Sequence, residues 1–173
     1  YSSTGLTADL ESLRSFYLDQ GYVQFQVVSQ QVTISPDRKD ITISINVQEG
    51  KQFRVGAIKI TGEMVVDEVE LQALVSLREG DVVSRKRINS VVTAMQKRLG
   101  EDGYAYANVR VGTEVNEEEQ TVMLQFVVLP GKPVRVRYIN FVGNEKTKDL
   151  VLRREMRQFE GEMYRRSKVD RSR

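Results

Sequence analysis

The sequence of 173 residues contains no cysteine and no histidine. Without histidine the chain lacks the commonest general base and the commonest metal ligand, and without cysteine it lacks thiol nucleophiles and disulfide bonds. No run approaches the roughly eighteen apolar residues that a membrane-spanning helix needs. The 26 basic and 24 acidic residues nearly balance, so the surface as a whole does not favour a polyanion. We therefore expect no enzyme, no catalytic residue, no metal and no cofactor.

The chain does contain a long internal repeat, with a spacing of 81 to 82 residues. The segment 53–62 matches 134–143 at a shift of 81, and Gly21 matches Gly103 at a shift of 82. Such a period is typical of tandem modules. Because the shift falls from 82 to 81 before Gly50, one residue was gained or lost in that interval. We expect this change in a tolerant surface turn.

One complete period predicts the order β-α-α-β-β. A strand is expected over 53–61, a first helix over about 66–77 and a second helix over about 85–99, followed by a hairpin. Ser84 is a suitable N-cap for the second helix, and the glycines at 100 and 103 can end it.

The predicted hairpins have polar tips at 35–40 and 116–120. Apolar residues alternate with mostly polar ones after each tip, which is the period of a half-buried strand. These alternating residues are Ile41, Ile43, Ile45 and Val47 in one hairpin and Val122, Leu124, Phe126 and Val128 in the other. Glu117, Glu118 and Glu119 form the densest acidic cluster, and their place at a tip favours a solvated turn over a catalytic site.

The fold class predicted from this order is α+β, with a three-stranded mixed sheet covered by two helices in each module. Residues 1–50 are predicted to be the C-terminal half of one module, 51–131 a complete module, and 132–173 the N-terminal half of a third. The chain thus looks like a piece of a longer array. Each half-module could be disordered or could pair with the complementary half of a neighbouring molecule, which would be domain swapping.

Three segments in this order carry a resemblance to a known family. They are DLESLRSFYLDQGY at 9–22, GYAY at 103–106 and VGNEKTKDLVLRREMRQ at 142–158. Together with the β-α-α-β-β repeat, they resemble polypeptide-transport-associated (POTRA) modules, which stand in tandem before the outer-membrane barrel of the Omp85 family. The resemblance covers nearly the whole chain and is closest to the third, fourth and fifth modules of the barrel-assembly members of that family.

The resemblance implies a scaffold at the periplasmic face of the bacterial outer membrane. Its implied partners are unfolded outer-membrane proteins and accessory lipoproteins, and its parent chain would be anchored by a C-terminal barrel that this sequence lacks. No nucleic acid is expected as a partner. The alternatives are a POTRA array of a related Omp85 or two-partner secretion transporter and, more remotely, a soluble repeat that binds nucleic acid through basic residues such as Arg165 and Arg166.

The means of substrate binding would be β-augmentation, in which an extended chain pairs with an exposed strand edge. We expect the first strand of each hairpin to be that edge, with polar side chains sharing one face. The candidate residues are Gln24, Gln26, Val28 and Gln30 in the first hairpin and Tyr106, Asn108 and Arg110 in the second. A solvated outer face with no binding role explains the same pattern.

A second candidate surface lies on the mixed-charge helix of the third module, where an accessory lipoprotein would dock. It consists of Arg153, Arg154, Glu155 and Arg157. Mixed charges on one helix face can orient a partner through paired bridges. A charged, solvated helix face is again the alternative.

Overall fold

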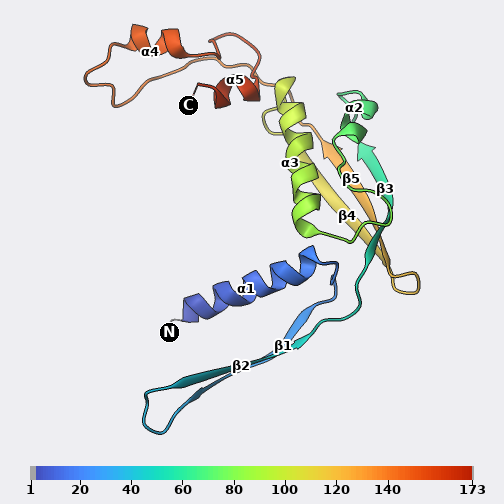
Figure 1. Cartoon of the computed structure of the whole chain (residues 1–173). Coiled ribbons are helices and arrows are strands. Elements are labelled where there is room, and N and C mark those ends of the chain that lie inside the picture. Colours follow the sequence, from blue (N-terminus) through green and yellow to red (C-terminus); the bar gives the residue numbers. More distant parts are fainter. Residues whose placement is uncertain (1–2, 173) are drawn as a thin grey trace. The chain divides into compact units, whose positions relative to one another are not determined.

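The computed structural model describes residues 3–172. Figure 1 shows its elements in chain order. They are α1 (Ser3–Asp19), β1 (Gln26–Ile34), β2 (Ile41–Gln48), β3 (Arg54–Gly62), α2 (Glu68–Ala73), α3 (Arg85–Glu101), β4 (Asn108–Asn116), β5 (Thr121–Leu129), α4 (Asp149–Glu155) and α5 (Arg166–Asp170).

The chain divides into two compact units, and the division runs through the middle of the predicted complete module. Unit 1 contains Tyr1–Ile58, Leu77–Ile88 and Thr113–Leu124. Unit 2 contains Lys59–Ser76, Asn89–Gly112 and Gln125–Arg173. The segments around Gly50-Lys51 and Gly131-Lys132, which we name the first junction and the second junction, therefore each lie inside one compact unit.

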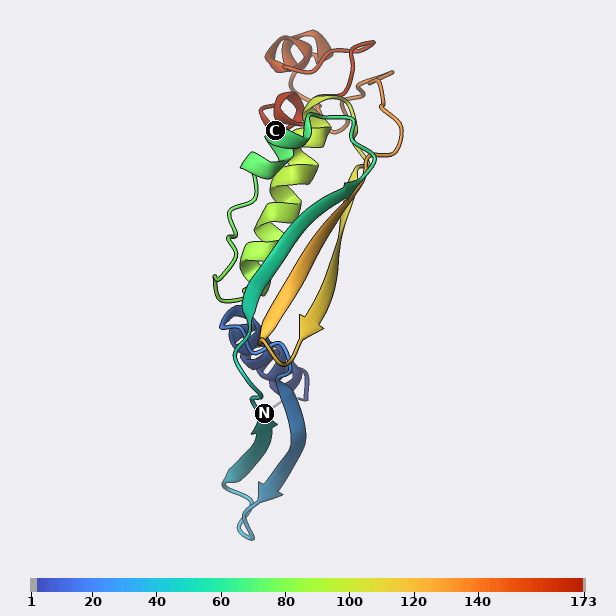
Figure 2. The same ribbon diagram turned by 90° about the vertical axis from the view of Figure 1, so that its right-hand side faces the viewer.

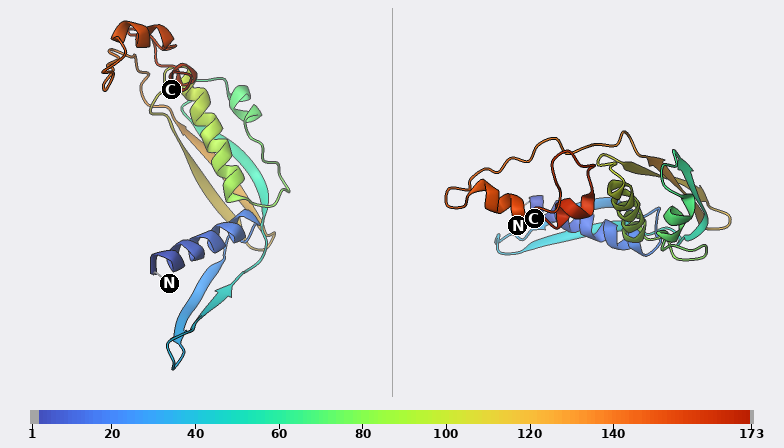
Figure 3. Two further views of the ribbon diagram at one scale, coloured as in Figure 1. Left: turned by 60° about the vertical axis from the view of Figure 1, so that its left-hand side comes forward. Right: turned by 90° about the horizontal axis from the view of Figure 1, so that it is seen from above.

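Strands β3, β5 and β4 form a three-stranded sheet in that order. The amide of Arg54 donates to the carbonyl of Gln120 and the amide of Glu63 donates to that of Val128, so β3 runs parallel to β5. Because β5 and β4 form an antiparallel hairpin, the sheet is mixed, which confirms the prediction. Figures 2 and 3 show α3 lying along one face of this sheet.

The buried side chains follow from the predicted periodicities. Residues of β5 alternate between buried and half-buried along the strand, and the helices contribute a buried stripe at helical spacing. The fully or almost fully buried residues on these elements are Leu71, Val91, Met95, Leu99, Val122, Leu124, Phe126 and Val128. These apolar side chains supply most of the driving force for folding.

The predicted helices are confirmed, with one shorter than expected. The Ser84 hydroxyl accepts from the amide of Arg87 at 3.3 Å, so α3 begins where the N-cap prediction placed it. The first helix was predicted over 66–77, but α2 covers only Glu68–Ala73. It begins there because the Asp67 carboxylate accepts from the Val69 amide at 3.0 Å, which caps the helix.

The expected place of the one-residue change between the repeats was wrong. Both hairpin tips contain four residues. In the first, the amide of Ser35 donates to the carbonyl of Asp40, and residues 36–39 lie between this bonded pair. In the second, β4 ends at Asn116 and β5 starts at Thr121, so residues 117–120 lie between them. The extra residue instead lies in β1, where the pairing with β2 shifts register between Val27 and Ser29. Val28 is therefore a β-bulge, which strands accommodate by a local kink.

The repeat also predicts a strand over 134–142, and none forms there. Arg135 makes only an isolated bridge to Met163, and the segment then continues without regular structure to α4. A strand needs a neighbour for its N–H and C=O groups. In the middle repeat β5 pairs with β3, whereas no strand among residues 3–172 pairs with 136–142.

Candidate binding surfaces

Strand β4 lies at an edge of the three-stranded sheet, as predicted for the first strand of this hairpin. Asn108 and Arg110 are exposed on it. Tyr106 was predicted to belong to the same strand but precedes it, because β4 begins only at Asn108. Its ring is exposed beside the start of the edge. Two of the three predicted residues, Asn108 and Arg110, therefore lie on the edge strand, and Tyr106 lies just before its first residue.

In the part of the chain that the structure describes, strand β1 pairs with β2 alone, so it is also an edge. Its predicted residues do not share a face. Gln26 lies opposite Gln48, whereas Gln30 lies opposite Ile45, and the bulge at Val28 separates the two alternations. Gln24 lies outside the strand, and its amide donates to the Glu117 carboxylate at 2.8 Å. The predicted polar face of the first hairpin is therefore wrong, because one inserted residue reverses the side on which every later side chain points.

The register instead gives the β1–β2 hairpin one apolar face. It contains Gln30 and seven apolar residues, which are Val27, Val32, Ile34, Ile41, Ile43, Ile45 and Val47. Most of these side chains are exposed, and Ile45 is 36% exposed where its repeat equivalent Phe126 is 0% exposed. A groove of about 360 Å³ runs between α1 and β1 and is lined by Leu10, Phe25 and Val27 among others.

The aromatic residues where α1 meets this hairpin form a cluster. The Tyr17 ring stacks on Phe25 at 4.2 Å between centroids and meets Tyr22 edge-on at 5.6 Å. The Tyr17 hydroxyl donates to Glu49 at 2.7 Å, and this hydrogen bond to a carboxylate is the main cause of the raised pKa of Tyr17. The cluster attaches the end of α1 to the base of the hairpin.

Arg153, predicted as a docking residue, already has several partners within its own unit. Its guanidinium bridges Asp149 at 2.8 Å and Glu160 at 2.9 Å, and it donates to the Ile139 carbonyl at 2.9 Å. The amide of Ile139 in turn donates to Glu160, and this bond together with Arg153 holds the pKa of Glu160 below its usual value. Arg153 therefore fastens α4 to the preceding segment.

The other predicted docking residues are exposed. Arg154 and Glu155 lie at the end of α4, whereas Arg157 lies outside the helix, contrary to the prediction, because α4 ends at Glu155. A groove of about 400 Å³ opens beside α4. Its lining combines apolar and charged side chains: Ile139, Leu150, Arg153, Arg154, Met156, Gln158, Phe159 and Glu160.

Several arginine and lysine residues that could have formed a basic surface are paired with acids. Lys168 bridges Glu162 at 2.8 Å, and Arg98 bridges Glu70 at 2.7 Å and Asp102 at 3.0 Å. Together with the Arg153 pairs, these bridges place an acidic side chain beside each of these three basic residues. Such exposed pairs contribute little to stability individually, but they reduce the free positive charge that a phosphate backbone would need.

Sequence reasoning missed Gln158, which is 1% exposed. Its amide donates to the Met163 carbonyl at 3.1 Å and its carbonyl accepts from the Arg165 amide at 2.9 Å. The repeat puts Leu77, a buried leucine, at the equivalent position, and that comparison would have flagged the polar replacement. Gln158 holds together the turn that leads from α4 to α5.

Within residues 3–172 no helix combines the length and apolarity required to span a membrane. The same part of the chain contains no group of three or more acidic residues arranged to hold a metal ion.

A comparison with protein-family models matches the chain to the POTRA family, described as a surface antigen variable number repeat. Three successive matches cover residues 1–50, 53–131 and 134–173.

Curated relatives carry matching names. The chain is 36% identical over 165 residues to the outer membrane protein assembly factor BamA of Neisseria meningitidis. The matched segment covers 95% of this chain and 21% of that protein. It is 32% identical to BamA of Buchnera aphidicola, over 98% of this chain and 28% of that protein. The chain thus spans less than a third of the length of these relatives.

Among solved structures, the POTRA3-5 fragment of Haemophilus influenzae BamA matches with a TM-score of 0.86 and 32% identity, over 96% of this chain and 66% of that one. BamA of Haemophilus ducreyi lacking POTRA domains 1-3 matches with a TM-score of 0.62 and 31% identity, over 69% of this chain and 23% of that one.

Proposed function

Because the chain belongs to the POTRA family, we propose that it is part of the periplasmic scaffold of an outer-membrane protein assembly factor. The relatives that carry this name support the proposal, since two of them match almost the whole chain at 32% and 36% identity. In this role the chain binds and positions other proteins and catalyses no reaction. We further propose that its modules are 1–50, 51–131 and 132–173.

The observation that carries a substrate-binding role is the free edge of β4. Within residues 3–172 no strand pairs with its outward N–H and C=O groups, and its other side pairs with β5, whose alternate side chains are buried in the core. An unfolded outer-membrane protein consists largely of segments that become strands, and such segments can add to an edge with little regard to side-chain sequence. Asn108 and Arg110 would flank the added strand, and Tyr106 would contact its end.

A pair of proline substitutions tests this proposal. Amides of an edge strand point alternately toward the neighbouring strand and away from it. Of Arg110→Pro and Val111→Pro, one therefore removes a sheet hydrogen bond and is expected to lower the melting temperature. The other removes an outward amide and leaves the melting temperature near that of the unsubstituted chain, but it abolishes binding of a fluorescent ten-residue peptide with alternating apolar and polar residues.

The fold-neutral proline variant provides the decisive measurement, and Arg110→Ala is its control because it alters the side chain and keeps the amide. Binding should survive Arg110→Ala and fail in the fold-neutral proline variant. Equal peptide affinity in all folded variants would show that β4 does not bind by strand addition, even if the chain is a scaffold.

We also propose the exposed end of α4, with Arg154, Glu155 and Arg157 beside the 400 Å³ groove, as the docking surface for an accessory lipoprotein. Arg153 supports this surface from within through its bridges to Asp149 and Glu160. Apolar groove residues such as Leu150 and Phe159 are exposed beside these charges, which is the usual composition of a protein interface.

Reversing the charge of Glu155 is expected to weaken docking without unfolding the chain. Glu155→Lys should lower the recovery of accessory lipoproteins in co-purification with the full-length parent by about tenfold or more, since a like-charge contact at an interface costs several kcal/mol. Glu145→Lys is the matched control, because Glu145 is another exposed acid of the same unit. If Glu155→Lys leaves the recovery of accessory lipoproteins unchanged, the end of α4 is not their docking surface.

A further inference from the structure

The two junctions between repeats contain the same set of contacts. Each junction lies inside one compact unit, so the residues before and after it pack together. Three contacts recur, and each pair of equivalent residues is separated by the repeat spacing of 81 or 82 residues. The first is a hydrogen bond to a glycine carbonyl, the second is a close approach of a side chain to the Cα of that glycine, and the third is a hydrogen bond from a backbone amide to an acidic side chain at the end of a helix.

The first contact is a backbone hydrogen bond across the junction. The amide of Phe53 donates to the Gly21 carbonyl at 2.8 Å, and the amide of Val134 donates to the Gly103 carbonyl at 2.9 Å. The second is a close approach at the same glycines. A Cβ on Gly21 would lie 2.8 Å from Val82, and one on Gly103 would lie 2.8 Å from Met163. At Gly103 the atom is the end of the flexible Met163 side chain, so the stronger requirement for glycine at both positions is the positive φ, +89° at Gly21 and +96° at Gly103.

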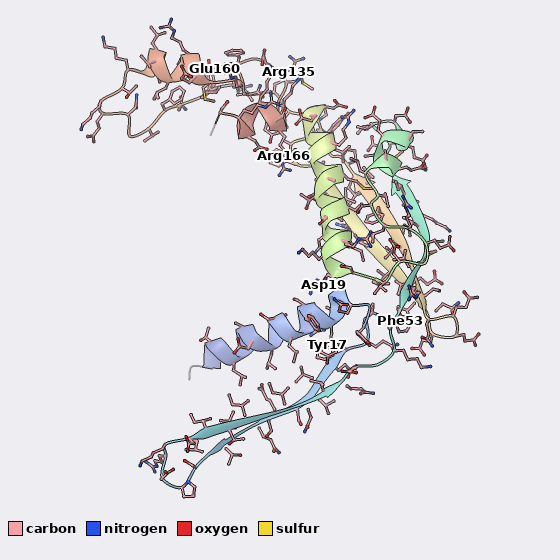
Figure 4. All side chains as sticks on the ribbon, viewed as in Figure 1. Tyr17, Asp19, Phe53, Arg135, Glu160 and Arg166 are labelled. Atoms are coloured by element: carbon pink, nitrogen blue, oxygen red, sulfur yellow. The ribbon has the colours of Figure 1, made fainter. Side chains whose placement is uncertain are left out.

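The third contact joins consecutive long helices through an acid. Asp19, the last residue of α1, accepts from the Lys86 amide at 2.8 Å. Glu101, the last residue of α3, accepts from the Ser167 amide at 2.8 Å and from the Ser167 hydroxyl at 2.6 Å. In Figure 4, Asp19 is labelled where α1 ends and Arg166 where α5 begins.

In both helices the capped amide occupies the second helical position. The first four amides of a helix have no partner within it, and a side-chain acceptor normally comes from the residue just before the helix. In α3, Ser84 caps Arg87 in that way and Asp19 supplies the further acceptor. In α5, the preceding residue Arg165 makes no capping bond, so the acceptor comes from Glu101 of the previous repeat.

We propose that Asp19 and Glu101 are positioning residues that lock the orientation of each repeat on the next. A carboxylate at the end of one helix satisfies the start of the following helix, where the helix dipole also favours a negative charge. The backbone bond to the glycine carbonyl at the same junction restricts the relative orientation of the two repeats further. The lock at the second junction keeps the first part of β4, residues 108–112, and the surface of α4 at a constant separation within unit 2.

Distance measurements between two spin labels test the lock, and the absence of native cysteine makes site-specific labelling simple. Labels at Lys97→Cys and Lys146→Cys, both exposed and in unit 2, report on the second junction. The otherwise unaltered chain should give one narrow distance peak. Glu101→Ala should lose that narrow peak, and Glu63→Ala, which removes an exposed acid of the same unit, should keep it.

Hydrogen exchange supplies a second readout. Loss of the capping bond in Glu101→Ala should accelerate exchange of the Ser167 amide by on the order of tenfold, whereas the amides of Met95 and Leu99 should keep their protection if the module stays folded. At the first junction, Asp19→Ala should broaden the distance between labels at Lys39→Cys and Arg85→Cys in the same way. Concordant results at both junctions would establish the lock as a repeated device.

A narrow peak that survives Glu101→Ala, or equal broadening in Glu63→Ala, would overturn the proposal. If Glu101→Ala does not fold, Glu101→Met replaces it, since methionine keeps a side chain of similar length and lacks the acceptor oxygens. Ser167 exchange that is unchanged in the folded methionine variant would then overturn the proposal, and accelerated exchange would support it. None of these outcomes depends on which protein the scaffold binds.

Discussion

Truncation of Phe126 to alanine is expected to destabilise the chain by about 3–5 kcal/mol. Phe126 lies in the middle of β5, the central strand of the three-stranded sheet, and its side chain is 0% exposed. Its removal exposes no new surface to water in the folded state but leaves a cavity among residues that pack at high density. A domain of this size has only about 5–15 kcal/mol of stability in total, so the variant should unfold at much lower urea concentration.

The repeat provides the matched control. Ile45 occupies the equivalent position on β2, but its side chain is 36% exposed because the β1–β2 hairpin face has less cover. Ile45→Ala should therefore cost about 1 kcal/mol or less. Urea unfolding followed by far-ultraviolet circular dichroism compares the two. A similar cost at both positions would mean that the hairpin face of unit 1 is covered in solution.

Sequence periodicity predicted most of the fold because both kinds of element appear with their own period. The apolar spacing that becomes α3 is helical, and the alternation that becomes β5 has the period of a strand. Ser84 marks where α3 begins, and it does so by a local hydrogen bond that a sequence pattern can reveal. The mixed sheet followed from the order β-α-α-β-β, since a strand, two helices and a hairpin in sequence can only meet in a few ways.

The bulge at Val28 was not predictable in the same way. A bulge is defined by two residues of one strand facing one residue of its partner, and this pairing is not contained in either strand alone. The alternation of glutamines at 24, 26 and 30 indicated one polar face, yet Gln26 and Gln30 lie on opposite faces. Comparison of the two repeats had located the interval of the extra residue but favoured the turn, because turns tolerate insertions more often.

The candidate docking surface shows a similar limit. Arg153 and Asp149 are four residues apart, so their ion pair is a local one that the sequence indicates. The bonds from Arg153 to Glu160 and to the Ile139 carbonyl depend on how distant segments fold back on α4. Charge pattern alone could not separate this internally bound arginine from the exposed Arg154 and Glu155. The junction acids Asp19 and Glu101, by contrast, could have been found by aligning the two copies.

The second large effect is expected at Gly62, at the end of β3. Its φ of +102° is unfavourable for any residue with a side chain, and an added Cβ would clash with the backbone of Val128, including its nitrogen at 2.7 Å. Strand β3 cannot retreat from β5 without breaking the parallel pairing. Gly62→Ala should therefore destabilise the chain by about 3 kcal/mol or more, combining backbone strain with steric displacement.

Gly143 separates these two causes, because it is the repeat equivalent of Gly62 with a similar φ of +82° but with no atom within 4 Å of an added Cβ. Gly143→Ala should cost only the conformational strain, about 1–2 kcal/mol. Urea unfolding of both variants measures the difference. If the two substitutions cost the same, strain at positive φ accounts for the whole effect. A larger loss at Gly62 would show that this glycine is required for the close approach of β3 to β5, which holds the sheet whose other edge is β4.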